Sequence, residues 1–167
     1  NLAAGQKAEA VVAGPAALRS LPEPLAKALS GVLDAYLQIG EKLASDSMDG
    51  VAAPARQVAE GIDAMLKVEI PDNPHFWHQH TEVAEIRGHA LELVAAKDIE
   101  KARAEFADAS MALSKLVRAT GVPPAYPKAV EELHCPMYRE GQGGTIWLHP
   151  PGEVKNPYYG KKMIGCF

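Results

Sequence analysis

Residues 24–50, PLAKALSGVLDAYLQIGEKLASDSMDG, carry the pattern that decides the fold. Apolar residues recur there at intervals of three and four, which places them on one face of an α-helix. The turn SDSMDG then interrupts the pattern and offers Asp46, Ser47 and Asp49 as N-caps for a following helix. The apolar face consists of Leu25, Leu29, Val32, Leu33, Tyr36, Leu37, Gly40 and Leu43. We therefore predict a helix from about Pro24 to Ala44.

Three more helical segments follow, at about 49–67, 74–96 and 99–120. Asp98 is the expected N-cap of the last segment, and Gly121 is placed to end it. In the third segment the predicted apolar face consists of Trp77, Ala84, Leu91 and Val94, with Ile86 and Leu93 beside it. Similar helical pairs joined by short turns predict an all-α fold, an up-down-up-down four-helix bundle with an irregular C-terminal tail packed on it.

The predicted organisation has three parts. Residues 1–21 are small and weakly patterned, and we interpret them as a linker or flexible arm. The helical region occupies 22–121. The irregular Cys/Met tail, 122–167, belongs to the same domain, and its segment AVEELHC is expected to add one or two helical turns.

Composition excludes several classes of protein. The 167 residues carry a net charge of −4 and are 47% hydrophobic, which fits one globular domain and gives no basic surface for nucleic acid. No run of 18 apolar residues exists that would span a membrane. The N-terminal residues show neither an initiator Met nor a signal peptide, so we expect a mature form or an excised piece of a longer chain.

The tail HCPMYREGQGGTIWLHPPGEVKNPYYGKKMIGCF, residues 134–167, contains both cysteines of the chain. Cys135 lies two residues before Met137, and Met163 lies three before Cys166, so each pair combines a thiolate with a thioether. His134 adjoins the first pair. Soft sulfur ligands favour Cu(I) or Ag(I) over zinc, which seldom recruits Met. If the two pairs meet, the tail is a soft-metal site.

A disulfide between Cys135 and Cys166 is the alternative interpretation. It would close a loop of about 30 residues and contribute about 3.5 kcal/mol in the chain-entropy model. The two methionines would then fill gaps in the packing, and the domain would need no cofactor. The residue chemistry alone does not decide between the metal site and the disulfide.

Catalytic motifs are missing from the sequence. It contains no G-x-S-x-G, no H-E-x-x-H, no Cys-x-x-Cys and no phosphate-binding loop, so we expect a binding domain and not an enzyme. A second histidine cluster, His75, His78 and His80, lies at the start of a predicted helix. Three histidines around Trp77 at a helix start could bind a metal, but solvated side chains are the more usual interpretation, and we assign no role to them.

The tail motifs CPMY, GGTIWL and EVKNPYYGKKMIGC resemble the C-terminal signature of an uncharacterised bacterial domain family. In that family a helical region with a segment like VLDAYLQIGEKLASDS precedes the tail, so the resemblance covers about residues 25–167. Such domains occur alone as exported proteins and as C-terminal extensions of periplasmic adaptor (membrane-fusion) subunits of copper/silver-type heavy-metal efflux pumps.

The resemblance implies a periplasmic or cell-surface domain that handles Cu(I) or Ag(I), with efflux-pump components or a metallochaperone as partners. It carries the ligand role onto Cys135, Met137, Met163 and Cys166, with His134 as a possible extra ligand. A structural role is implied for the remaining motif residues, which are Trp147, Asn156, Pro157, Tyr158, Tyr159 and Gly160.

Overall fold

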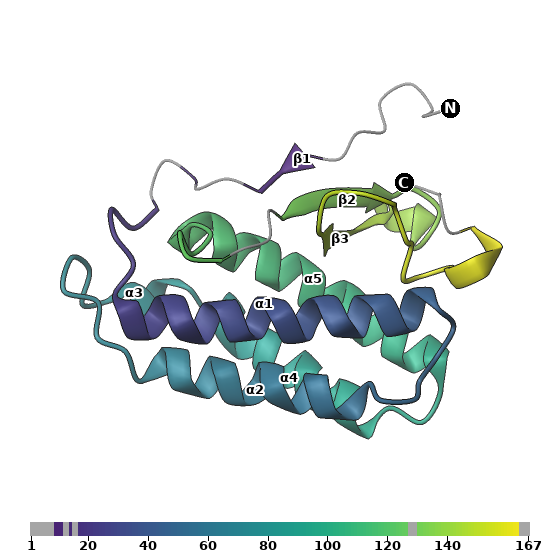
Figure 1. Cartoon of the computed structure of the whole chain (residues 1–167), viewed down its shortest axis with the longest axis horizontal. Coiled ribbons are helices and arrows are strands. Elements are labelled where there is room, and N and C mark those ends of the chain that lie inside the picture. Colours follow the sequence, from purple (N-terminus) through teal and green to yellow (C-terminus); the bar gives the residue numbers. More distant parts are fainter. Residues whose placement is uncertain (1–8, 12–13, 15–16, 127–129, 164–167) are drawn as a thin grey trace.

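The computed structural model describes residues 9–11, 14, 17–126 and 130–163. Within these residues the protein is predominantly helical, as predicted, with a small three-stranded sheet (Figure 1). The helices are α1 (Glu23–Ala44), α2 (Ala52–Leu66), α3 (Phe76–Gln79), α4 (Glu82–Ala95) and α5 (Ile99–Thr120). The strands are β1 (Glu9–Ala10), β2 (Glu131–Cys135) and β3 (Thr145–His149), and two 3-10 turns are η1 (Glu140–Gln142) and η2 (Gly160–Lys162).

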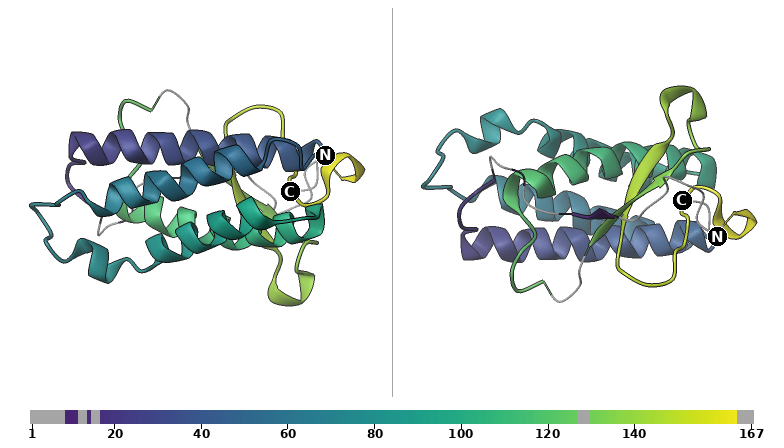
Figure 2. Two further views of the ribbon diagram at one scale, coloured as in Figure 1. Left: turned by 90° about the horizontal axis from the view of Figure 1, so that it is seen from below. Right: turned by 90° about the horizontal axis from the view of Figure 1, so that it is seen from above.

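The four long helices pack in chain order. α1 contacts α2, α2 contacts α4, and α4 contacts α5, whereas α1 and α5 have few direct contacts with each other. The sheet lies across this open α1–α5 side of the helical layer, and β3 contacts both helices (Figures 1 and 2). None of the described helices is both long enough and apolar enough to cross a bilayer.

The tail is not irregular throughout, which corrects the sequence prediction. β2 and β3 form an antiparallel pair in which Glu131 faces His149 and Cys135 faces Thr145. The predicted helical turn in AVEELHC is wrong, because its last five residues form β2. Side chains of both strands join the same hydrophobic core as the helices; they include Leu133, Cys135, Trp147 and Leu148. The sheet therefore completes the core.

The third predicted helix is broken. α3 ends at Gln79 and α4 begins at Glu82, with His80 and Thr81 between them. The break resets the helical phase, so an apolar face counted from Trp77 through it is wrong: Ala84 is exposed, and Leu91 keeps 43% of its surface exposed. The buried residues of α4 are Val83, Ile86, Ala90 and Leu93.

Helix ends follow their capping chemistry where a cap exists. The Asp98 carboxylate accepts a hydrogen bond from the backbone N–H of Lys101 at 2.8 Å, and Gly121, at φ 84°, ends α5 as predicted. α2 begins at Ala52 without a side-chain cap, so the expected capping by Asp46, Ser47 or Asp49 is wrong. Ser47 instead accepts a bond from the N–H of Asp49 within the turn.

Part of the segment predicted as a linker is docked. β1 pairs antiparallel with β2, with Glu9 opposite Glu132. Val11 is buried, and its N–H donates to the carbonyl of Val130 at 2.9 Å. The N–H of Leu18 donates to the carbonyl of Ala119 at the end of α5. These bonds tie the N-terminal arm to the sheet and to α5.

Candidate functional site

Two tail segments that are distant in sequence meet through their tyrosines. The ring of Tyr138 stacks on Tyr158 with centroids 4.6 Å apart and meets Tyr159 edge-on at 6.1 Å. Tyr138 directly follows Met137, and Tyr159 precedes Met163 by four residues. The segments that carry the two predicted sulfur pairs are thus neighbours in the fold.

A tight turn at residues 156–160 sets up this contact. Asn156 is fully buried, and its side-chain oxygen accepts the N–H of Tyr158 at 2.8 Å and that of Tyr159 at 3.3 Å. An Asx-type turn of this kind fixes the backbone from which both rings project. Gly160 follows at φ 59°, and a Cβ there would collide with the carboxylate of Asp46. The turn therefore requires a residue without a side chain at this position.

Arg103 of α5 anchors the same turn to the helices. It is 6% exposed; its Nε donates to the carbonyl of Pro157 at 2.8 Å, and its Nη2 donates to Leu43 O and to the Asp46 carboxylate. Asp46 also accepts the N–H of Lys161 at 3.0 Å. The Lys161 N–H and the Arg103 guanidinium lower the pKa of Asp46. One buried guanidinium thus links the end of α1, α5 and the tail.

A network of buried hydroxyl groups also links α1, α5 and the tail, through β3. The N–H of Leu148 donates to Tyr36 Oη at 2.9 Å, and Tyr36 Oη lies 2.6 Å from Ser110 Oγ. Because Ser110 donates to the carbonyl of Phe106, Tyr36 is the donor to Ser110. Tyr158 Oη donates to the carbonyl of Ile146 at 2.5 Å. Burial raises the pKa of both tyrosines, so their hydroxyls stay protonated.

The predicted sulfur ligands occupy different depths of the structure. Cys135 is fully buried at the end of β2, and it has no disulfide partner among the described residues. Met137 keeps 45% of its surface exposed, and Met163 is half-buried. Cys166 lies outside the described residues. A site at this end would therefore extend from the core to the surface.

His134 points away from the thiol. Neighbouring residues of a strand alternate between its two faces, and β2 buries Cys135 while it exposes His134. The His134 Nε2 atom lies 2.8 Å from the carbonyl of Gly143, to which it donates. The structure does not bring this imidazole to the face of the sheet that holds Cys135. Of the other histidines, His75 and His78 are exposed, and His80 pairs with Glu82 at 3.0 Å.

Among the residues that the structure describes, one group of metal-ligand type was missed in the sequence: His89, Glu105 and Asp108, whose ligand atoms lie within 4.8 Å of one another. His89 Nδ1 lies 2.6 Å from Glu105. Lys101 also binds Glu105, and Arg139 of the tail binds Asp108 at 2.6 Å. Burial raises the pKa of Glu105, but the hydrogen bonds from Lys101 and His89 outweigh it and lower the pKa overall. These cations already balance both carboxylates, so the group acts as an ion-pair network between α4, α5 and the tail.

Comparison with known proteins places the helical part of the chain. Residues 32–124 match the family described as Protein of unknown function (DUF3347), and this range is more than half of the chain. The chain belongs to the DUF3347 family. No curated protein and no solved structure matches it. The DUF3347 match begins within α1 and ends before β2, so it includes the later part of α1 and the helices to α5 but none of the sulfur residues of the tail.

Proposed function

We propose that this DUF3347 protein is a non-enzymatic soft-metal-binding domain, in which the tail holds Cu(I) or Ag(I) through Cys135, Met137, Met163 and Cys166. The supporting observation is the stacking of Tyr138 on Tyr158, because it makes neighbours of the Cys-Pro-Met segment and the segment that leads to Met163. Thiolate and thioether donors suit a monovalent soft cation. His134 is left out of the ligand set, since it faces the other side of β2.

The helices serve as a rigid platform for this site. We interpret α1, α2, α4 and α5 as an up-down-up-down four-helix bundle whose α1–α5 side is filled by the sheet. Arg103 and the Tyr36 network hold the tail on this platform from two sides. Ligands fixed by such contacts need little ordering when the ion binds, which favours affinity.

Exchange of ligands is the proposed mechanism, so no general acid or base takes part. Met137, the most exposed of the described residues in the proposed ligand set, is the entry point for an ion delivered by another soft site. Following the family resemblance, we propose a periplasmic or cell-surface location, association with copper/silver-type efflux adaptors, and a pump component or metallochaperone as the partner.

The test uses Met137→Leu and Met163→Leu, which conserve volume and remove the thioether sulfur. We expect each change to weaken Cu(I) binding at least tenfold in a chelator competition and to leave the unfolding midpoint of the apo protein nearly unchanged. Met111→Leu is the matched control, because Met111 is 46% exposed on α5 and outside the proposed ligand set. Equal affinity of the wild type and the Met137/Met163 double variant would refute the thioether ligands.

The second candidate is a structural interaction module with a Cys135–Cys166 disulfide. It is favoured by the complete burial of Cys135, which limits access of an exchanging ion. A thiol count on protein purified without oxygen or reductant separates the two functions. Two thiols that Cu(I) protects support the metal site. Zero thiols, a melting temperature that falls with reductant, and copper left on the chelator support the disulfide.

A further inference from the structure

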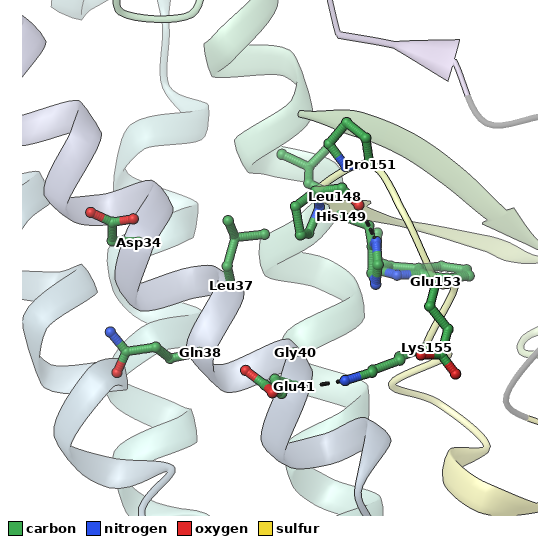
Figure 3. A pocket seen from close by; sticks show the side chains of 12 residues that line it. Asp34, Leu37, Gln38, Gly40, Glu41, Leu148, His149, Pro151, Glu153 and Lys155 are labelled. Carbon is green, nitrogen blue, oxygen red and sulfur yellow. Dashed lines mark hydrogen bonds and ion pairs between the residues drawn. The ribbon is translucent and has the colours of Figure 1, made fainter. Parts of the chain in front are cut away.

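A second feature lies away from the sulfur residues, on the side where β3 crosses α1. A solvent-open cleft of about 430 Å³ separates the middle of α1 from the loop that follows β3 (Figure 3). Clefts of roughly 300–1,000 Å³ are the usual size of small-molecule sites. Leu37, Leu148 and Pro151 give it a mainly apolar lining. Its size and lining suit a small organic molecule.

Charges around the cleft are predominantly negative. Among the described lining residues, the carboxylates of Glu41 on α1 and of Glu153 on the loop stand against the ammonium of Lys155 (Figure 3). Asp34 also lines the cleft, but it accepts a hydrogen bond from Tyr126 and is not counted in this balance. Lys155 lies 3.9 Å from Glu41, so its charge is offset within the lining. The remaining charge favours a positively charged ligand.

His149 adds an acceptor to this lining. Burial lowers its pKa, with the hydrogen bond to Pro150 acting in the opposite direction, so the ring is neutral at pH 7. Its Nδ1 lies 2.5 Å from the carbonyl of Pro150 and must donate to it, because a carbonyl only accepts. The Nε2 atom of the neutral ring then carries the lone pair. An ammonium group can donate to this nitrogen and to the carboxylates.

Trp147 provides a reporter for this cleft. Trp147 lines it and is 1% exposed, yet its indole N–H has no hydrogen-bond partner among the described residues. A protonated amine has no acceptor for this N–H, so the indole serves as a reporter of binding and not as a contact of the ligand. The only other tryptophan, Trp77, donates its indole N–H to the carbonyl of Val68 at 2.9 Å.

From these observations we propose that the α1–β3 cleft binds a small primary amine with an apolar body, an arylalkylamine in chemical class. The body packs on Leu37, Leu148 and Pro151, and the ammonium group meets Glu41 and Glu153 at the rim. This site is separate from the proposed metal site and does not depend on it.

The two indole resonances give a direct assay. In ¹H–¹⁵N spectra of tryptophan-labelled protein, phenethylamine should shift the Trp147 indole peak saturably and leave the Trp77 peak in place. 2-Phenylethanol, the neutral analogue, should bind at least fivefold more weakly, and 3-phenylpropionate more weakly still. A Trp147 peak that does not move, or equal affinity for the amine and the alcohol, would overturn the proposal.

Variants that remove negative or positive charge from the lining test the electrostatic part of the proposal, because they should change the affinity for phenethylamine in opposite directions. Glu41→Gln with Glu153→Gln should weaken phenethylamine binding about five- to tenfold at low ionic strength, and the loss should shrink as salt is added. Lys155→Met should strengthen binding. The control pair is Glu85→Gln with Glu92→Gln, two exposed acids of α4 with the same charge change, and it should have no effect. If the control pair weakens binding as much as the rim pair, only the net charge matters and the cleft is not the site.

Discussion

Replacing Arg103 by Met removes the guanidinium that anchors the tail and keeps an unbranched apolar stem. Three hydrogen bonds are lost, to Pro157 O, Leu43 O and the Asp46 carboxylate. Leu43 O still accepts the N–H of Asp46 at 3.0 Å, so its loss is partial. Pro157 O, within a buried residue, has no other bond shown among the described residues and is left unsatisfied.

The expected destabilisation is the sum of the losses at the three acceptors of Arg103. An unsatisfied buried carbonyl costs about 1–3 kcal/mol, and a partial loss at Leu43 costs about 0.5–1.5 kcal/mol. The Asp46 side chain is 41% exposed, so its ion pair with Arg103 adds only about 0–1 kcal/mol. We expect the free energy of unfolding to fall by about 2–4 kcal/mol, which most domains survive in the folded state.

Equilibrium urea unfolding measures this change. Far-UV circular dichroism follows the helices, and in a Trp77→Phe background tryptophan fluorescence follows Trp147 in β3, so coincident midpoints show that the sheet and helices unfold together. Asp46→Asn is the comparison, because Asn tolerates the left-handed backbone at residue 46 and should cost less than about 1 kcal/mol. Arg103→Lys keeps the charge without the planar fork and should recover less than half of the loss. An Arg103→Met loss below about 1 kcal/mol, or one equalled by Asp46→Asn, would refute the anchoring role.

Two further predictions concern the same docking. Tyr36→Phe leaves the N–H of Leu148 unsatisfied in the core and should lower the free energy of unfolding by about 1–3 kcal/mol in urea titrations. Tyr126→Phe, which loses one long 3.4 Å bond to Asp34, is the control and should cost less; equal losses would contradict the network. Acid should also weaken the docking: the pKa of Asp46 is lowered in the folded state, so its contribution is complete above the ordinary Asp pKa of about 3.9 and is lost as the pH falls through the lowered value. Urea midpoints between pH 5 and pH 2.5 should fall more steeply for the wild type than for Asp46→Asn, and parallel curves would exclude this carboxylate.

The long helices could be predicted from the sequence because their signals are local. α5 begins and ends as predicted, since Asp98 caps one end and Gly121 terminates the other. α1 was predicted to within a residue at its start from its apolar periodicity and flanking prolines. The break between α3 and α4 has no comparable signal, because no Pro or Gly stands at His80 or Thr81. Periodicity was therefore counted across it in the wrong phase.

The sheet was missed for a different reason. β2 and β3 are each five residues long, and β2 begins with Glu131 and Glu132, so neither strand has a strong alternating pattern. What stabilises the pair is tertiary: the Gly-rich turn brings the strands together, and the open side between α1 and α5 buries Leu133 and Trp147. Local strand propensity says nothing about the open side that α1 and α5 leave for the sheet, so it could not predict these strands.

The candidate site was likewise predictable only in its local features. The sequence identified the sulfur residues by their chemistry. It did not show that Tyr138 meets Tyr158, because that contact depends on the turn at Asn156 and on Arg103. Arg103 is 54 residues away from the carbonyl that it binds. Arg103 itself is a charged residue in a helix, and such residues are usually solvated. Its burial becomes predictable only once α5 is known to contact both the end of α1 and the tail.

The depth of Cys135 also constrains how the proposed metal site would work. The thiol belongs to the same core cluster as Leu133 and Trp147, so an ion bound to it has to enter the core or draw the end of β2 outward. Entry into an intact core adds binding energy to the folded state alone and raises the unfolding midpoint with metal concentration. Outward movement breaks the pairing of Cys135 with Thr145 and exposes apolar surface, which offsets that gain. A site that opens therefore binds with a lower apparent affinity, and the apolar surface that it exposes makes the heat-capacity change of metal binding less negative than for a preformed site; calorimetry at several temperatures distinguishes the two.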